Sequence, residues 1–358
     1  MDWSDYEVDG QLSIFDLTME EFKITKPIRL IELFAGVGSQ AMALRDLGAD
    51  FEHYKISEWE YNSNSSYKAI HSLDNTDYSF GMARKEVVDA LMKLGISADG
   101  KKPMTYKEIS RKSEIWQRKI YNEFKQCKNI GSITNFNGTD LEIVDTDKYC
   151  YIMTYSFPCQ DLSVAGKQAG MTKGSGTRSG LLWEVERLLN EVKNLPQVLL
   201  MENVPQVHGS KNMADFQKWI SFLESKGYSN YWQDLNAKNY GVAQNRNRCF
   251  MVSILGNYRY EFPKPIELTK RMKDYLEDEV DEKYYINNEK AQKLIDTLIS
   301  NGTIPRAEQS RREYLRQCVD LTINEPREIE TANCIKARYD AGISNFKADG
   351  TGVVERYG

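Results

Sequence analysis

Short apolar runs recur along the first two thirds of the chain and predict the strands of a buried sheet. They are rich in Val, Ile, Leu, Met and Tyr and cover residues 28–34, 51–56, 149–155, 197–201 and 249–255. Such runs, bounded by Gly, Pro or polar residues, are typical of strands covered on both faces. Segments with helical periodicity lie between them, after Ser39, after Leu181 and from Ala214 to Ser225. Strands that alternate with helices predict an α/β fold.

The first run ends in a glycine-rich turn, Phe34-Ala35-Gly36-Val37-Gly38, and Ser39 is placed to cap the helix that follows. Such a turn suits a nucleotide-like ligand, because glycines let it approach the backbone and N–H groups satisfy its polar atoms. The second run ends in Glu58 and Trp59. A carboxylate at this point accepts hydrogen bonds from a ribose, and the indole offers an aromatic face for adenine. A tight turn with a solvated Glu is an equal alternative on these residues alone.

The segment 62–135 differs from its surroundings. It is polar and helical, for example over Arg84–Leu94 and Tyr106–Lys128, and it has no strong strands. We therefore predict a helical insertion packed on the sheet edge, with no chemistry of its own. The stretch 137–141 that follows resembles a turn at the end of a strand, and it closes with Asp140 and Leu141. Asp140 is placed to receive an amino group of a bound base. A plain turn aspartate is an equally good interpretation.

Phe157-Pro158-Cys159-Gln160 follows the third run. Pro158 has no N–H and ends the strand, which places Cys159 on a loop at the carboxyl end, where open α/β sheets gather ligands. A thiol there is a candidate nucleophile, although most single cysteines are buried and inert. The glycine-rich stretch 166–180 carries Lys167, Lys173 and Arg178. It predicts a mobile basic lid that closes on an anionic polymer, and a plain disordered loop is the alternative.

Two later strand ends carry polar groups as well. The run 197–201 leads into Glu202-Asn203-Val204, where the carboxyl group is a candidate proton donor. Gln244-Asn245-Arg246-Asn247-Arg248 leads into the run 249–255. Arg246 and Arg248 share one face of an extended chain and suit a phosphate, a carboxylate or a base oxygen.

The pattern changes after residue 256. Pro263 and Pro265 mark a boundary, residues 267–283 are acidic and 306–316 are rich in arginine. We predict an N-terminal arm over 1–27, a main domain over 28–256 with the insertion at about 62–135, and a smaller domain over 257–358.

The composition limits the kinds of partner, site and location that we expect for this protein. The formal charge is −5, so any nucleic acid must meet a local basic surface. The six cysteines are scattered without a Cys-x-x-Cys pair and there are only three histidines, which favours reduced thiols and no metal centre. We find no run of about 18 apolar residues and no leader segment, so we expect a cytoplasmic protein without a membrane span.

Taken in order, these motifs resemble the cytosine-5 DNA methyltransferases of restriction-modification systems and phages. The matching segments are 34–38, 58–59, 140–141, 157–163, 202–204 and 244–248. Each is weak alone, but six in series are very unlikely to arise by chance. The likeness covers roughly residues 28–256 without the insertion.

The resemblance implies a Rossmann-like, S-adenosylmethionine-dependent methyltransferase sheet followed by a smaller target-recognition domain. It also implies that the cofactor is held by Phe34, Ala35, Gly36, Val37, Gly38, Glu58, Trp59, Asp140, Leu141 and Pro158. The target cytosine is expected to be flipped out of double-stranded DNA.

The same resemblance assigns the catalytic roles. Cys159, as thiolate, adds to C6 of the base, while Glu202 holds N3. Arg248, with Arg246, binds the base carbonyl and a phosphate. We expect four residues of the mobile loop to approach the nucleic acid: Gln160, Ser163, Lys167 and Arg178. The chemistry needs no metal.

Two features of the family are not found in these 358 residues. One is a helix with an Arg-Glu pair after the recognition domain, and the other is a Gly-Asn-Ser segment that completes the cofactor pocket. Three explanations are open: the sequence is truncated, a second polypeptide or the N-terminal arm supplies these features, or the enzyme is degenerate. We otherwise expect a monomer that is encoded by a bacterial host or a phage. The alternatives are a tRNA cytosine-5 methyltransferase of the same branch, a catalytically incomplete DNA-binding subunit, and a dinucleotide-dependent oxidoreductase.

Overall fold

A computed structural model describes residues 19–159, 162, 170–282, 289–302, 314–320, 327–333 and 351–357. The chain divides into two compact units. The first comprises Met1–Gln233 and Cys249–Phe262, and the second comprises Asp234–Arg248 and Pro263–Gly358. This division differs from the predicted boundary after residue 256, because Asp234–Arg248 groups with the later part of the chain.

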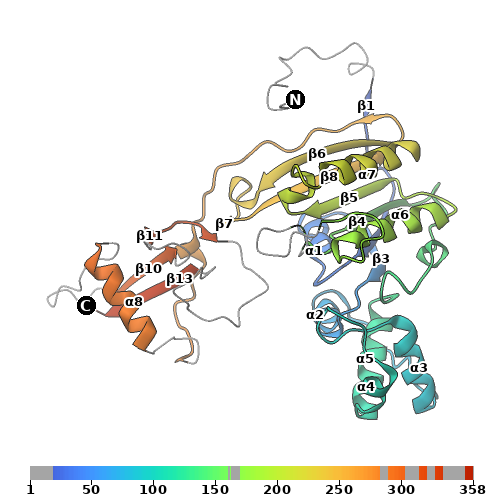
Figure 1. Cartoon of the computed structure of the whole chain (residues 1–358), viewed down its shortest axis with the longest axis horizontal. Coiled ribbons are helices and arrows are strands. Elements are labelled where there is room, and N and C mark those ends of the chain that lie inside the picture. The colour runs from blue at the N-terminus through green and yellow to red at the C-terminus, as the bar shows by residue number, and fades with distance from the viewer. Residues whose placement is uncertain are drawn as a thin grey trace. The chain divides into compact units, whose positions relative to one another are not determined.

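Among the described residues, the first unit is built on a six-stranded sheet with the order β3-β2-β4-β5-β8-β6 (Figure 1). The strands are β2 (Ile28–Leu33), β3 (Phe51–Ser57), β4 (Cys150–Tyr155), β5 (Val198–Asn203), β6 (Tyr228–Asn236) and β8 (Asn247–Leu255). The last residues of β6, 234–236, and the first of β8, 247–248, are assigned to the second unit. β2 pairs in parallel with β3 and β4, and β4 with β5, whereas β8 runs antiparallel to β5. The carboxyl ends of four strands therefore meet at one edge, as the predicted α/β fold requires.

Helices cover both faces of this sheet. Each face needs cover because alternate residues of β4 are apolar on both sides. Tyr151, Met153 and Tyr155 belong to the core on one face, and Cys150 and Ile152 belong to the core on the other. The first core is closed by α6 (Leu182–Glu191) and α7 (Met213–Ser225), and the second by α1 (Ser39–Asp46).

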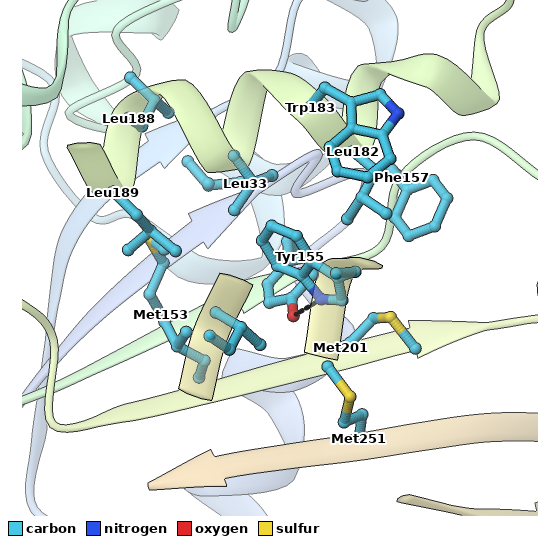
Figure 2. Close-up of a cluster of buried hydrophobic side chains, with 14 of the residues drawn as sticks. Leu33, Met153, Tyr155, Phe157, Leu182, Trp183, Leu188, Leu189, Met201 and Met251 are labelled. Atoms are coloured by element: carbon cyan, nitrogen blue, oxygen red, sulfur yellow. Dashed lines mark hydrogen bonds between the residues drawn. The ribbon is translucent and has the colours of Figure 1, made fainter. Parts of the chain in front are cut away.

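Figure 2 shows the first core. Leu189 of α6 lies near Met153, and Leu182 of the same helix lies near Tyr155 and Phe157. Trp219 of α7 donates a hydrogen bond from Nε1 to the Tyr155 hydroxyl at 3.1 Å, so the one polar atom of that buried side chain is satisfied. This core fixes β4 and β5, whose ends carry the candidate catalytic residues.

The segment 62–135 forms α2 (Tyr61–His71), α3 (Arg84–Leu94), α4 (Tyr106–Ser110) and α5 (Glu114–Gln126). The predicted helix over 106–128 is thus two helices, because Ser113 caps α5 by accepting a hydrogen bond from the Trp116 N–H at 3.2 Å. The helices share their own apolar core, made of Val87, Val88, Leu91, Ile96, Met104, Ile109, Ile120 and Phe124. The chain then returns to the sheet edge, where the Ile130 N–H donates to the Ile56 carbonyl at 2.9 Å.

The remaining strands among the described residues form smaller sheets of two or three strands. β1 (Glu20–Glu21) pairs with β9 (Tyr258–Arg259) in the first unit. In the second unit, β10 (Tyr314–Asp320) pairs with β11 (Arg327–Glu328) and β13 (Thr351–Tyr357), and β7 (Gln244–Asn245) pairs with β12 (Ala332–Asn333). Helix α8 (Glu289–Ser300) contributes Leu298 to a small core with Val319. Within the described residues, the helices are all too short or too polar to span a bilayer.

Candidate active site

The glycine turn has a backbone that few side chains tolerate. Phe34, Gly36 and Gly38 have φ values of +57°, +55° and +78°, in the region that favours glycine. A Cβ added to Gly36 would meet no atom within 4 Å, so the turn borders open space on that side. Gly38 is the N-cap residue of α1, which corrects the predicted cap at Ser39. Ser39 is already helical, and its hydroxyl donates to Oε1 of Gln40 at 3.0 Å.

Glu58 joins the end of β3 to this turn. Its Oε2 accepts a hydrogen bond from the Gly36 N–H at 2.9 Å, and its Oε1 accepts one from the Glu60 N–H at 2.7 Å. Desolvation raises the pKa of the Glu58 carboxyl group, and the hydrogen bonds to its oxygens oppose that shift. The structure therefore brings together the glycine turn and the acidic residue, and Trp59 follows directly.

Asn129 was missed in the sequence because it lies 71 positions after Glu58. Its Oδ1 accepts from the Glu58 N–H at 3.2 Å and from the Gly131 N–H at 2.8 Å. Its Nδ2 donates to the Glu58 carbonyl at 2.8 Å. One side chain at the end of the helical segment thus fixes both backbone groups of Glu58.

The loop that carries Cys159 is held by its neighbours. The buried Asn203 donates from Nδ2 to the Phe157 carbonyl at 3.0 Å, and the buried Ser179 donates from Oγ to the Pro158 carbonyl at 2.7 Å. Cys159 is partly buried, and its carbonyl accepts the Leu162 N–H at 3.0 Å. β4 already ends at Tyr155, before Pro158, so the strand stops earlier than the predicted boundary.

Glu202 lies in the next strand of the sheet. β4 and β5 pair with Tyr155 opposite Met201, so Cys159 and Glu202 belong to the same carboxyl edge. Glu202 and Asn203 are the last residues of β5 rather than residues after it, because β8 pairs with them through Phe250 and Cys249. Glu202 is partly buried and retains some exposure at the end of the strand.

Asp140 and Leu141 lie in a short 3-10 helix, Gly138–Leu141, and no strand precedes it over residues 131–137. The predicted position at a strand end is therefore wrong. Asp140 is exposed, and its Oδ2 accepts the Asn137 N–H at 2.8 Å, while Leu141 is fully buried. The Gly138 N–H donates to Glu191 of α6 at 2.7 Å, which docks the turn on that helix.

Of the predicted nucleic-acid loop, Gln160, Ser163 and Lys167 lie outside the described residues. The described part, 170–180, is anchored to the helices beside it. Thr172 donates to Oδ2 of Asp215 at 2.8 Å, and Lys173 pairs with Glu186 at 2.5 Å. Arg178 immediately precedes the 3-10 helix Ser179–Leu181 that holds the Pro158 carbonyl.

Arg246 and Arg248 lie in the second unit by the division of the chain. Both are partly buried, whereas Asn245 and Asn247 are exposed, as expected for alternate residues of an extended segment. The Arg246 carbonyl accepts the Ala237 N–H at 2.9 Å, and Nη1 of Arg248 donates to the Asn247 carbonyl at 2.7 Å.

The chain is similar in sequence to known proteins. Residues 90–344 match a family model described as C-5 cytosine-specific DNA methylase. The chain is 39% identical over 268 residues to the type II methyltransferase M2.ScrFI of Lactococcus lactis subsp. cremoris, covering 73% of this chain and 71% of that protein. It is 40% identical over 268 residues to the orphan methyltransferase M.SssI of Spiroplasma monobiae, covering 74% and 68%. Among solved structures, the S. pombe Dnmt2 methyltransferase aligns with a TM-score of 0.48 at 17% identity, covering 88% of this chain and 78% of that one.

Proposed function

Because the chain belongs to the family of C-5 cytosine-specific DNA methylases, we propose that it methylates a flipped cytosine in double-stranded DNA through a covalent adduct of Cys159. Membership makes it a methyltransferase that uses S-adenosylmethionine and takes DNA as substrate. The roles of individual residues are the content of the proposal.

The residues around the glycine turn fit the cofactor. The open space beside Gly36 leaves room for a ligand against the backbone. The Glu58 carboxylate is fixed by two N–H donors and keeps lone pairs for ribose hydroxyls. Trp59 would cover the adenine, with Asp140 at its amino group, and Leu141 and Pro158 would line the pocket. Bound S-adenosylmethionine supplies an electrophilic methyl group.

The observation that carries the proposal is the contact between two motifs. Asn203 of the Glu202 motif binds the Phe157 carbonyl of the Cys159 loop, at the edge where adjacent parallel strands end. A nucleophile and a carboxyl group are thereby held on one side of the sheet. This is the arrangement that nucleophilic attack on a base requires.

In the proposed mechanism, the Cys159 thiolate forms a bond to C6, and the electron pair of the C5–C6 double bond makes C5 nucleophilic. Glu202 holds a proton at N3 and stabilises the adduct, and Arg248 with Arg246 binds the carbonyl oxygen and a phosphate. C5 would then take the methyl group as the methyl–sulfur bond of S-adenosylmethionine breaks and its electron pair stays on that sulfur. The C5 proton passes to solvent, and the electron pair of the C5–H bond re-forms the double bond and expels the Cys159 thiolate, which restores the aromatic ring.

The test is transfer of labelled methyl groups from S-adenosylmethionine to unmethylated duplex DNA. Cys159→Ser should abolish transfer, whereas Cys150→Ala at the opposite end of β4 should retain it. Duplex DNA with 5-fluorocytosine should trap the wild-type chain covalently, because fluorine blocks the final loss from C5. A parallel assay with tRNA distinguishes the alternative substrate.

Methylation that survives in Cys159→Ser, or preferential methylation of tRNA, would contradict the proposal. Cofactor binding without transfer would indicate that a C-terminal segment or a second polypeptide is needed to complete the enzyme. Sedimentation of the active species then decides between the expected monomer and a complex.

A further inference from the structure

Beneath the glycine turn lies a group of side chains that the proposed mechanism does not use. It consists of Glu32 on β2, His53 on β3, and Tyr67 and His71 on α2, which we call the Glu32 cluster. Glu32 and Tyr67 are each only 1% exposed. Since the residues come from three elements, only the fold brings them together.

Glu32 accepts two hydrogen bonds. The Tyr67 hydroxyl donates to Oε2 at 2.6 Å, and the Ala41 N–H donates to Oε1 at 3.3 Å. Ala41 is in the first turn of α1, whose N-cap Gly38 has no side chain that accepts a hydrogen bond. A carboxylate from the neighbouring strand takes the place of that cap, and the dipole of α1 favours its ionised form.

The two histidines extend the cluster to the turn itself. Nδ1 of His53 lies 2.9 Å from the Tyr67 hydroxyl, and Nε2 of His71 lies 2.9 Å from the Val37 carbonyl. Because a carbonyl only accepts, His71 donates from Nε2. The Tyr67 and His71 ring centroids are 4.5 Å apart, so the rings pack directly on each other.

The turn also packs tightly on these rings. A Cβ added to Gly38 would overlap Nε2 of His71 and would lie 2.6 Å from Cε2 of Tyr67. Any shift of α2 therefore displaces the Gly38 backbone, and through the Val37 carbonyl it displaces the rest of the turn.

We propose that Glu32 is a positioning residue, which with Tyr67, His53 and His71 sets the conformation of the glycine turn and thereby the affinity for S-adenosylmethionine. The inference rests on the proposed function, since it takes the turn as the cofactor-binding element. The cluster acts through the backbone of the turn. Its loss changes the Kd for the cofactor and leaves the methyl-transfer step unaltered.

The charge of Glu32 should make the effect of the cluster on cofactor binding depend on pH. Burial raises the pKa of Glu32 to about 7, although the hydrogen bonds from Tyr67 and Ala41 oppose the shift. Burial lowers the pKa of His53 to about 4 and also lowers the pKa of His71. The other ionisable groups around the cluster are Arg45, Cys127 and Lys128. Burial raises the pKa of Cys127 to about 12. Glu32 therefore changes charge near neutral pH, and its ionised form is the better acceptor for both donors.

The experiment measures S-adenosylmethionine binding to the full chain by calorimetry between about pH 6 and pH 8. Tyr67→Phe should raise the Kd about tenfold, as expected for one buried hydrogen bond to a charged group. Glu32→Gln should raise the Kd by a similar factor at the upper pH and match the wild type at the lower pH. Tyr228→Phe is the matched control, because it removes a buried hydroxyl bond to the Pro196 carbonyl at the far side of the sheet.

Amide hydrogen exchange of residues 34–41 in the absence of cofactor tests the positioning role of the cluster separately from the proposed binding of S-adenosylmethionine. Faster exchange there in Tyr67→Phe and Glu32→Gln, but not in Tyr228→Phe, supports the positioning role. A Kd that stays at the wild-type value in both variants, at every pH, overturns it. If the turn exchanges faster but the wild-type chain binds no S-adenosylmethionine, the proposed function fails while the structural role of the cluster stands.

Discussion

At the scale of single residues, ionisation of Glu32 should order the glycine turn and at the same time lower the free energy of unfolding. Its folded pKa of about 7 exceeds the ordinary value of 4.5, so the folded chain binds more protons than the unfolded chain between these values. The free energy of unfolding should therefore fall as pH rises from about 4.5 to about 7, by about 3 kcal/mol. Glu32→Gln removes this loss, because an amide does not titrate.

Urea unfolding of the wild type and of Glu32→Gln at about pH 5 and pH 8 checks this prediction. The variant should gain about 3 kcal/mol on the wild type between the two conditions. Equal differences at both pH values would mean that the Glu32 carboxyl group keeps one charge state throughout.

The two glycines of the turn should respond differently to the same substitution. Gly36→Ala meets no atom and bears only the strain of a left-handed backbone, about 1–2 kcal/mol. Gly38→Ala bears the same strain and also collides with His71 and Tyr67. We expect it to lose about 1–3 kcal/mol more, as overpacked sites do. Thermal unfolding of the two variants side by side measures the difference, and equal melting temperatures would show that α2 yields without penalty.

The glycine turn could be predicted from the sequence, but the side chains that hold it in place could not. Phe34–Gly38 is visible because glycines follow an apolar run, which is a local pattern. Tyr67 is 35 positions from Glu32, and Asn129 is 71 positions from Glu58. No local pattern connects such pairs, so only the packed structure reveals that helix α2 and the segment after α5 hold the predicted site.

At the scale of elements, the link between the end of β5 and the loop after β4 should matter for both stability and methyl transfer. Asn203→Ala removes the bond to the Phe157 carbonyl and the one that Oδ1 accepts from the Val204 N–H at 2.8 Å. Two buried bonds and an unsatisfied carbonyl should lower the free energy of unfolding by about 2–3 kcal/mol. Methyl transfer should fall at least about tenfold, because displacement of a reacting group by about 1 Å is enough.

Asn194→Ala is the control for this prediction. It removes a bond of the same kind, from Nδ2 to the Ile143 carbonyl at 3.1 Å, without touching the Cys159 loop. Rates of methyl transfer and urea unfolding should be compared for both variants. An Asn203→Ala enzyme with wild-type transfer would show that the loop keeps its shape without this link.

Element boundaries were predicted less well than the elements themselves. The apolar runs marked β2, β3, β4 and β5 correctly because burial on both faces demands such runs. The strand β6 was missed, since it lies at the end of the sheet order and its residues are mostly half-exposed. Asp140 illustrates a wrong inference of another kind, where a turn signal was correct but the strand before it does not exist.

At the scale of the whole molecule, the predicted site residues divide between the two units. Phe34–Gly38, Glu58, Trp59, Asp140, Leu141 and Pro158 lie in the first unit, whereas Arg246 and Arg248 lie in the second. If the first group binds the cofactor and the second binds the base and phosphate, the two functions should separate by mutation. Arg248→Ala should leave the Kd for S-adenosylmethionine within twofold of the wild type. Loss of a charged hydrogen bond of about 1.5–3 kcal/mol should slow methyl transfer at saturating cofactor by roughly 10- to 100-fold.

The control for this separation is Arg259→Ala in the first unit. Arg259 pairs with Glu21 at 3.3 Å beside the β1–β9 pair, and its exposed ion pair contributes little. We expect it to change neither cofactor binding nor transfer. Calorimetry with S-adenosylmethionine and single-turnover transfer to duplex DNA measure the two functions on the same preparations. Arg248→Ala could weaken cofactor binding as strongly as it slows transfer. The proposed separation of cofactor binding and base binding between the two units would then be wrong, and Arg248 would act on both functions through the fold. If transfer alone is lost, the second unit carries the contacts to the nucleic acid, as a net charge of −5 requires of some local basic surface.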